Sequence, residues 1–149
     1  MHTLLFDSMD LGLAAKYRRS DIHAVIFMLC LGRQRRGIYH GALITYYKGK
    51  PKLSKLGNCS LGMFIFINGE NSSDLIESIA VHEYGHSIQS LITGPLYLAV
   101  IGLPSLIWAR RFALKRKTGE SCDKYTSRYP ERQANTLGER TTGGKPVRW

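Results

Sequence analysis

Cysteine is scarce in this chain of 149 residues, and the cysteines lie far apart. Cys30, Cys59 and Cys122 are odd in number, and none belongs to a Cys-x-x-Cys pair. This arrangement argues against a disulfide framework, because such a framework pairs an even number of cysteines. We expect three reduced thiols, as in a cytosolic setting.

Acidic residues are also few: 11 Asp and Glu stand against 21 Lys and Arg, which gives a formal net charge of +10. A basic excess can indicate nucleic-acid binding, but no RNA-binding or helix-turn-helix signature accompanies it here. We therefore expect no specific nucleic-acid partner. An anionic membrane surface accounts for the charge at least as well.

We expect neither internal repeats nor a secretory signal. Residues 24–31 are apolar, but this run is too short to cross a bilayer, and no small-residue cleavage site follows it. The length and the 44% of apolar residues suit one domain with a real core. We expect a poorly patterned arm over residues 1–36, the folded domain over 37–140 and a flexible tail over 141–149.

The segment from residue 37 to residue 69 has the composition of β-strands. β-branched and aromatic residues fill 38–47 and 61–67, and a turn pattern lies at 48–51. Asn68 and Gly69 end the second run. This pattern predicts a small antiparallel sheet ahead of the next helix.

The motif that carries chemistry is His82-Glu83-x-x-His86. Positions i and i+4 share one face of a helix, so both imidazoles can bind a single zinc ion. Glu83 lies off that line and is placed to take a proton from a water molecule that the metal activates. The alternative is a helix that carries two histidines by chance.

Helix signals surround the motif. Asp74 and Glu77 resemble a capping box, and Gly94 with Pro95 supplies a stop, so a helix is predicted from about residue 73 to residue 93. Gly85 inside this helix costs about 1 kcal/mol relative to Ala. We expect another backbone or the metal site to approach closely there, with a merely tolerated glycine as the alternative.

Nineteen uncharged residues, 91–109, follow the helix and are long enough to cross a bilayer. Trp108 and the basic segment 110–117 are typical of a cytoplasmic membrane border. Gly and Pro at 94–95 and 102–104 interrupt the run, which favours a bent, re-entrant or interfacial segment. We expect membrane association through 91–109 with the active site on the cytoplasmic side. A soluble cytoplasmic protein with this run in its core is the alternative.

A second short motif, Glu131-x-x-Ala134-Asn135, lies near the C-terminus. Together the two motifs resemble those of gluzincin metallopeptidases of the CAAX prenyl protease and heat-shock membrane protease type, whose second motif is Glu-x-x-Ala-Asp. The resemblance covers residues 61–138, about half the chain. It implies an α+β, zincin-like fold in which a small sheet precedes the active-site helix and a short C-terminal helix follows.

The resemblance also implies the ligand set: His82, His86 and Glu131 would hold Zn²⁺, with Glu83 as the catalytic base. The local pattern is compatible with Glu131, because Pro130 suits the first turn of a helix over about 130–137. Asn135 stands where the family has Asp. Its carbonyl can still accept a hydrogen bond from a histidine ligand, but it carries no charge.

The implied function is a zinc-dependent peptidase that hydrolyses peptide or protein substrates by a metal-activated water. In zincins an edge strand pairs with the extended substrate, so Met63, Phe64 and Ile65 are candidates for that strand, with core packing as the alternative. The donor to the oxyanion stays open among four residues: Tyr84, Tyr125, Tyr129 and His40. Two other functions stay open: a non-catalytic zinc-binding regulator on the same scaffold, and a basic membrane-surface binding protein.

Overall fold

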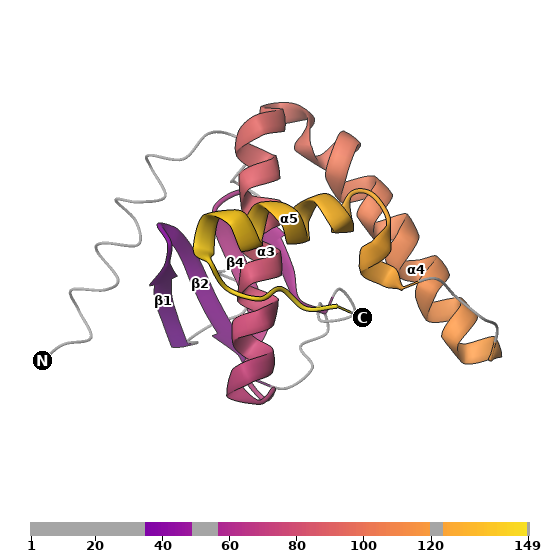
Figure 1. Ribbon diagram of the computed structural model, residues 1–149, viewed down its shortest axis with the longest axis horizontal. Helices are drawn as coiled ribbons and strands as arrows, with labels where there is room; N and C mark the ends of the chain where they lie inside the picture. The colour runs from indigo at the N-terminus through magenta and orange to yellow at the C-terminus, as the bar shows by residue number, and fades with distance from the viewer. Residues whose placement is uncertain (1–34, 49–56, 120–123, 149) are drawn as a thin grey trace, which may run out of the picture.

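A computed structural model describes residues 35–48, 57–119 and 124–148. Residues 1–34 of the expected N-terminal arm lie outside the described residues, as do Cys30 and Cys122. The described residues form an α+β structure, in which a four-stranded sheet packs against one of three α-helices (Figure 1).

The sheet consists of two hairpins that lie side by side. Its strands are β1 (Arg35–Tyr39), β2 (Ala42–Tyr47), β3 (Cys59–Leu61) and β4 (Phe64–Asn68), in the spatial order β1-β2-β4-β3. Each hairpin is antiparallel, but β2 and β4 pair in parallel, with Leu43 opposite Phe64. The sheet is therefore mixed, and the prediction of an antiparallel sheet is wrong at this pair.

Each of the two predicted strands contains a tight turn. His40 and Gly41 have φ values of 48° and 89°, as a type I′ turn between β1 and β2 requires. Gly62, with a φ of 62°, opens the turn between β3 and β4. A histidine in the left-handed region is uncommon, so the pattern over 38–47 predicts a continuous strand, and that prediction is wrong at His40 and Gly41.

Helix α3 (Ser73–Thr93) covers one face of the sheet. Its Ile79 and Ala80 pack against buried Ile44, Ile65 and Ile67 of the two central strands. The predicted bounds of this helix are confirmed at both ends, and Gly94 with a φ of 55° terminates it.

The apolar run turns sharply after α3. It continues through a short 3₁₀-helix, η3 (Gly94–Leu96), and a π-helical turn, η4 (Leu98–Gly102), into α4 (Leu103–Thr118). Across this break the chain bends by 120°, close to the Gly and Pro residues that interrupt the run. Among the described residues no single helix is long and apolar enough to cross a membrane, although the bent pair has the necessary length and composition.

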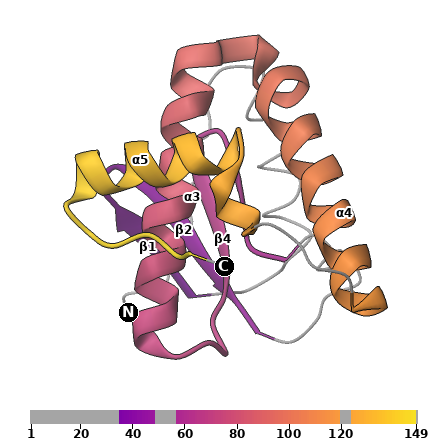
Figure 2. The same cartoon turned by 45° about the vertical axis from the view of Figure 1, so that its right-hand side comes forward.

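The chain returns to α3 through η5 (Tyr125–Ser127) and α5 (Glu131–Thr142). Helix α5 begins where the sequence predicts and runs five residues beyond the expected end near 137. It crosses α3 on the side away from the sheet, whereas α4 points away from both (Figure 1, Figure 2). The tail, for which we expected flexibility, lies against α3: Val147 is buried, and its N–H donates to the Ser78 carbonyl.

Candidate metal centre

Helix α3 places two histidines on its buried face. His82 and His86 are one turn apart, their ring centroids are 4.8 Å from each other, and both side chains are almost inaccessible to solvent. A pair of imidazoles buried in this way needs polar partners, because unpaired polar groups are costly in the interior. Those partners come mainly from α5.

Two glycine contacts bring α5 against α3. A Cβ atom on Gly85 would overlap the carbonyl oxygen of Ala134, and a Cβ atom on Gly138 would overlap the carbonyl oxygen of Val81. The close approach expected at Gly85 is thus confirmed, and its partner is the backbone of α5. Sequence reasoning did not single out Gly138, because it follows the predicted helix end near 137, where a glycine indicates a stop.

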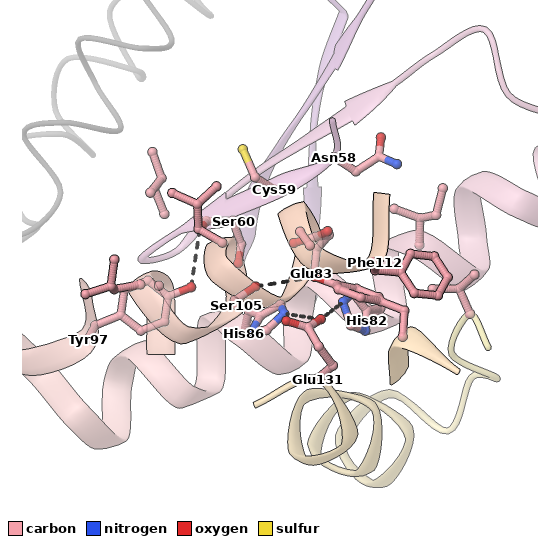
Figure 3. A pocket seen from close by; sticks show the side chains of 18 of the residues that line it. Asn58, Cys59, Ser60, His82, Glu83, His86, Tyr97, Ser105, Phe112 and Glu131 are labelled. Carbon is pink, nitrogen blue, oxygen red and sulfur yellow. Dashed lines mark hydrogen bonds and ion pairs between the residues drawn. The ribbon is translucent and has the colours of Figure 1, made fainter. Parts of the chain in front are cut away.

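The contact directs Glu131 toward both histidines. Its Oε2 atom lies 3.1 Å from Nε2 of His82 and 3.3 Å from Nε2 of His86 (Figure 3). One ligand atom from each of the three residues lies within 4.8 Å of the others. His82, His86 and Glu131 therefore form a buried group that can hold a metal ion.

The carboxylate itself fits a cation. Glu131 is fully buried, and its Oε1 atom has no hydrogen-bond partner among the described residues. Burial favours the neutral acid, but the close neighbours His82 and His86 outweigh it and hold the pKa of Glu131 well below its usual range. A charged oxygen and an unpaired oxygen at the same site are what a metal ion would satisfy.

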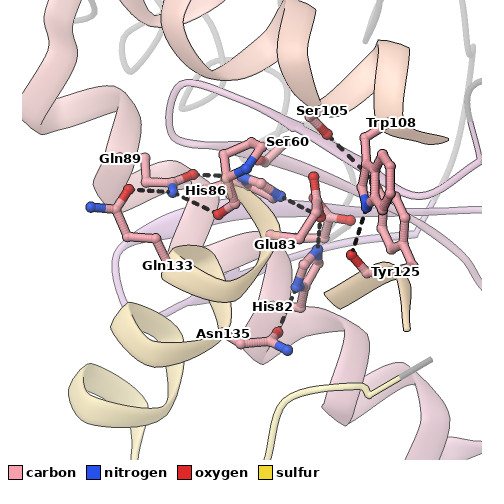
Figure 4. Close-up of polar contacts among 12 residues, drawn as sticks. Ser60, His82, Glu83, His86, Gln89, Ser105, Trp108, Tyr125, Gln133 and Asn135 are labelled. Carbon is pink, nitrogen blue, oxygen red and sulfur yellow. Dashed lines mark hydrogen bonds and ion pairs between the residues drawn. The ribbon is translucent and has the colours of Figure 1, made fainter. Parts of the chain in front are cut away.

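The outer nitrogen of each histidine is held by an amide side chain. Nδ1 of His82 lies 2.7 Å from Oδ1 of Asn135, and Nδ1 of His86 lies 2.7 Å from Oε1 of Gln89 (Figure 4). An amide oxygen can only accept, so each Nδ1 carries the proton and each Nε2 keeps its lone pair for a metal. The structure thus places Asn135 where we expected it, beside a histidine of the cluster.

Gln89 is the polar residue that sequence reasoning missed. It is buried one turn after His86, and its Nε2 donates to the carbonyl oxygen of Pro130 and to Oε1 of Gln133. Gln89 therefore ties the histidine to the start of α5. On the other side of the cluster, Nδ2 of Asn135 donates to the carbonyl of Val147, so the tail helps to orient this amide.

Glu83 is buried beside the cluster but does not belong to it. Burial raises the pKa of Glu83 to about 7, although the neighbouring His82 acts in the opposite direction. A carboxyl group that titrates near neutrality has the proton affinity required of a general base.

A pocket of about 690 Å³ opens onto these residues. Its polar end contains His82, Glu83, His86 and Glu131, and its apolar walls include residues of α4 and β3 (Figure 3). Tyr125 also lines the pocket. Its hydroxyl lies 3.5 Å from that of Ser105, and its carbonyl accepts a hydrogen bond from Nε1 of Trp108, so α4 holds it in place.

The structure separates the four tyrosine and histidine candidates for an oxyanion donor. The hydroxyl of Tyr84 donates to the carbonyl of His40, in the β1–β2 turn, and the hydroxyl of Tyr129 donates to the carbonyl of Val100. Neither of these tyrosines lines the pocket, and His40 does not line it either. Tyr125 lines it, and burial, with Glu131 nearby, raises the pKa of this phenol above its usual range.

The candidate substrate strand needs a correction. β4 lies inside the sheet between β2 and β3, and Phe64 and Ile65 are buried, so neither can pair with a substrate. Met63 is in the turn that precedes β4. The edge strand beside the pocket is β3: Cys59, Ser60 and Leu61 line the pocket, and the carbonyl of Ser60 accepts a hydrogen bond from Tyr97.

Comparisons of the chain with protein-family models, curated proteins and solved structures find no match. Any function must therefore be inferred from the site itself.

Proposed function

We propose that the protein is a zinc-dependent peptidase that hydrolyses peptide bonds, with Glu83 as general base. The observation that carries this proposal is the buried convergence of His82, His86 and Glu131, each histidine oriented through its outer nitrogen. Two imidazoles and one carboxylate are a donor set used by catalytic zinc sites, which keep a further position open.

The same donor set also suits Fe(II) in oxygenases, so the ligands alone do not select hydrolysis. Glu83 favours it, because a buried carboxylate beside the ligands but outside the ligand group has a role when water must be deprotonated. When bound, zinc would act as a Lewis acid toward water and the substrate carbonyl.

The protein's own residues supply the remaining parts. Glu83 would take the proton from the attacking water and later transfer it to the leaving amine. The Tyr125 hydroxyl would donate a hydrogen bond to the oxyanion, and Ser105 and Trp108 hold it in position. The edge of β3 beside the pocket would bind an extended peptide by main-chain hydrogen bonds.

The test combines metal analysis with a peptide-library digest. We expect one zinc per chain, cleavage that a chelator abolishes, and recovery on addition of zinc alone. Stoichiometric zinc without cleavage would favour a zinc-binding regulator, and bound iron with substrate-dependent oxygen consumption would favour an oxygenase. No bound metal in protein purified with zinc present would contradict the proposal.

A further inference from the structure

Large apolar side chains are exposed along the turn between α3 and α4, which we call the apolar bend. Its members are Leu91, Ile92, Leu96, Leu98, Val100, Leu103 and Ile107. The exposed fraction is 70% for Ile92, 64% for Leu91 and 63% for Leu96. Seven exposed large apolar side chains within residues 91–107 are more than the scattered single leucines of an ordinary surface, and they indicate a binding face.

The charge next to the bend has one sign. No acidic residue occurs between Glu83 and Glu120, whereas five basic residues follow the bend on α4. They are Arg110, Arg111, Lys115, Arg116 and Lys117. An apolar surface beside a cationic helix is complementary to an anionic bilayer, where apolar side chains enter the acyl boundary and basic side chains contact headgroups.

The geometry favours insertion of the bend over a straight crossing. The two helical segments that meet there are bent by 120°, so α3 and α4 both run back from the same side of the bend (Figure 2). No residue of α4 is buried. The bend is thus a protrusion that can enter one leaflet without carrying the metal centre across.

We propose that the apolar bend docks the protein on anionic lipid membranes, with its exposed apolar side chains in the interface and the basic residues of α4 at the headgroups. Leu98 and Leu103 belong to the bend and also line the pocket of the metal centre. The pocket therefore adjoins the docked surface. If the peptidase function holds, its substrates are peptide segments presented at that surface; the docking itself does not depend on the function.

Flotation of the full-length protein with phosphatidylcholine vesicles, with and without phosphatidylserine, tests the docking. We expect strong flotation with the anionic vesicles and weak flotation with the neutral ones. The paired change Ile92→Asp with Leu96→Asp should lower binding by about a hundredfold or more, because it charges the apolar contact. Ile38→Asp is the matched control, since Ile38 is 68% exposed on β1, and it should bind as the wild type does.

A second pair of variants tests whether the basic residues of α4 contribute to docking. Lys115→Ser with Lys117→Ser should weaken binding to anionic vesicles by about thirtyfold. Arg140→Ser with Lys145→Ser removes the same charge from α5 and the tail and should have little effect. Zinc content is measured on every variant, so that loss of docking with normal zinc is distinguished from failure of the metal centre.

Several results would overturn the proposal. They are no flotation of the wild type, equal flotation with both vesicle types, and unchanged binding after Ile92→Asp with Leu96→Asp. Dimerisation of the wild type that this double change abolishes, without vesicle binding, would show that a second copy covers the bend instead.

Discussion

Helix α5 is largely polar, yet Glu131, Ala134 and Gly138 are buried in it, whereas α4 is richer in apolar residues and none of its residues is buried. The difference lies in how each helix meets α3. Two glycines let the backbones of α3 and α5 approach, and a fully buried carboxylate then reaches two histidines. Composition alone would have predicted that α4 is buried and that α5 is exposed. Close backbone contact, not hydrophobicity, selects the helix that builds the site.

The largest expected effect is at the ligands that α3 and α5 contribute. Replacing a ligand by alanine should lower zinc affinity by more than about a hundredfold, which we expect for His82→Ala, His86→Ala and Glu131→Ala. This loss exceeds the loss of about 10-fold to 100-fold expected when a hydrogen-bond partner of a ligand is removed. Glu139→Ala is the matched control, because it removes a carboxylate from the exposed side of α5. Competition with a chromophoric chelator measures the affinities. Equal zinc affinity of the Glu131 and Glu139 variants would show that α5 contributes no ligand to the site.

The next largest effect is expected at Glu83, where a substitution should impair catalysis without loss of zinc. Glu83→Gln keeps the shape but removes the base, so we expect kcat to fall by about 10² to 10⁴ while zinc content stays unchanged. Peptide turnover and metal analysis on the same preparation provide both readouts. A variant that binds zinc and cleaves at the wild-type rate would show that Glu83 is not the base.

A smaller effect would show what α4 contributes to the site. Tyr125→Phe removes the hydroxyl that α4 holds in the pocket, and we expect kcat to fall by about 10² to 10³ with little change in zinc affinity. Tyr129→Phe serves as the control, because Tyr129 does not line the pocket. Equal rates for the two variants would show that Tyr125 does not donate to the oxyanion.

The amides that orient the histidines should have milder effects. Asn135→Ala and Gln89→Ala each remove an acceptor at 2.7 Å from a ring nitrogen and should weaken zinc binding by about 10-fold to 100-fold. We expect Asn135→Asp to be tolerated or to tighten binding, since it keeps the acceptor for His82 and adds charge, while it loses the hydrogen bond to the Val147 carbonyl. Calorimetric zinc titration separates these outcomes. Tenfold weaker binding by Asn135→Asp would contradict the assigned role.

The last prediction concerns stability. Gly85→Ala forces a methyl group into the Ala134 carbonyl and should lower the free energy of unfolding by about 1–3 kcal/mol or more. Gly102→Ala, next to α4, would place its Cβ 3.4 Å from the Leu98 side chain and 3.9 Å from the Tyr97 carbonyl oxygen, which are ordinary contacts, and it should be neutral or stabilising. Urea unfolding measures both. Similar stabilities would mean that α5 does not pack as closely as described.

Local sequence predicted the structure correctly where a residue type has one dominant structural role. The bounds of α3, the close approach at Gly85 and the start of α5 could all be read from local signals. The two hairpin turns could not, since His40 is a poor marker for positive φ. The parallel pairing of β2 with β4 depends on long-range contacts that periodicity does not encode.

The same division holds in the site. His82, Glu83 and His86 are close in sequence, so helical geometry relates them directly, whereas the approach of Glu131 depends on a helix packing 45 residues later. Gln89 was missed because a buried glutamine on an apolar helix face has no motif of its own. The predicted substrate strand is wrong for a topological reason: β4 lies between β2 and β3 in the sheet, and local sequence does not encode which strand is at an edge.

X-ray absorption at the zinc edge of the purified protein tests the central claim most directly, because it reports the ligand atoms themselves. The account predicts two imidazole nitrogens together with oxygen ligands at about 2.0–2.1 Å and no sulfur. Glu131→Ala should alter the oxygen shell and leave the imidazole signal. A sulfur shell at about 2.3 Å would contradict the account, because a cysteine would then take the position assigned to Glu131.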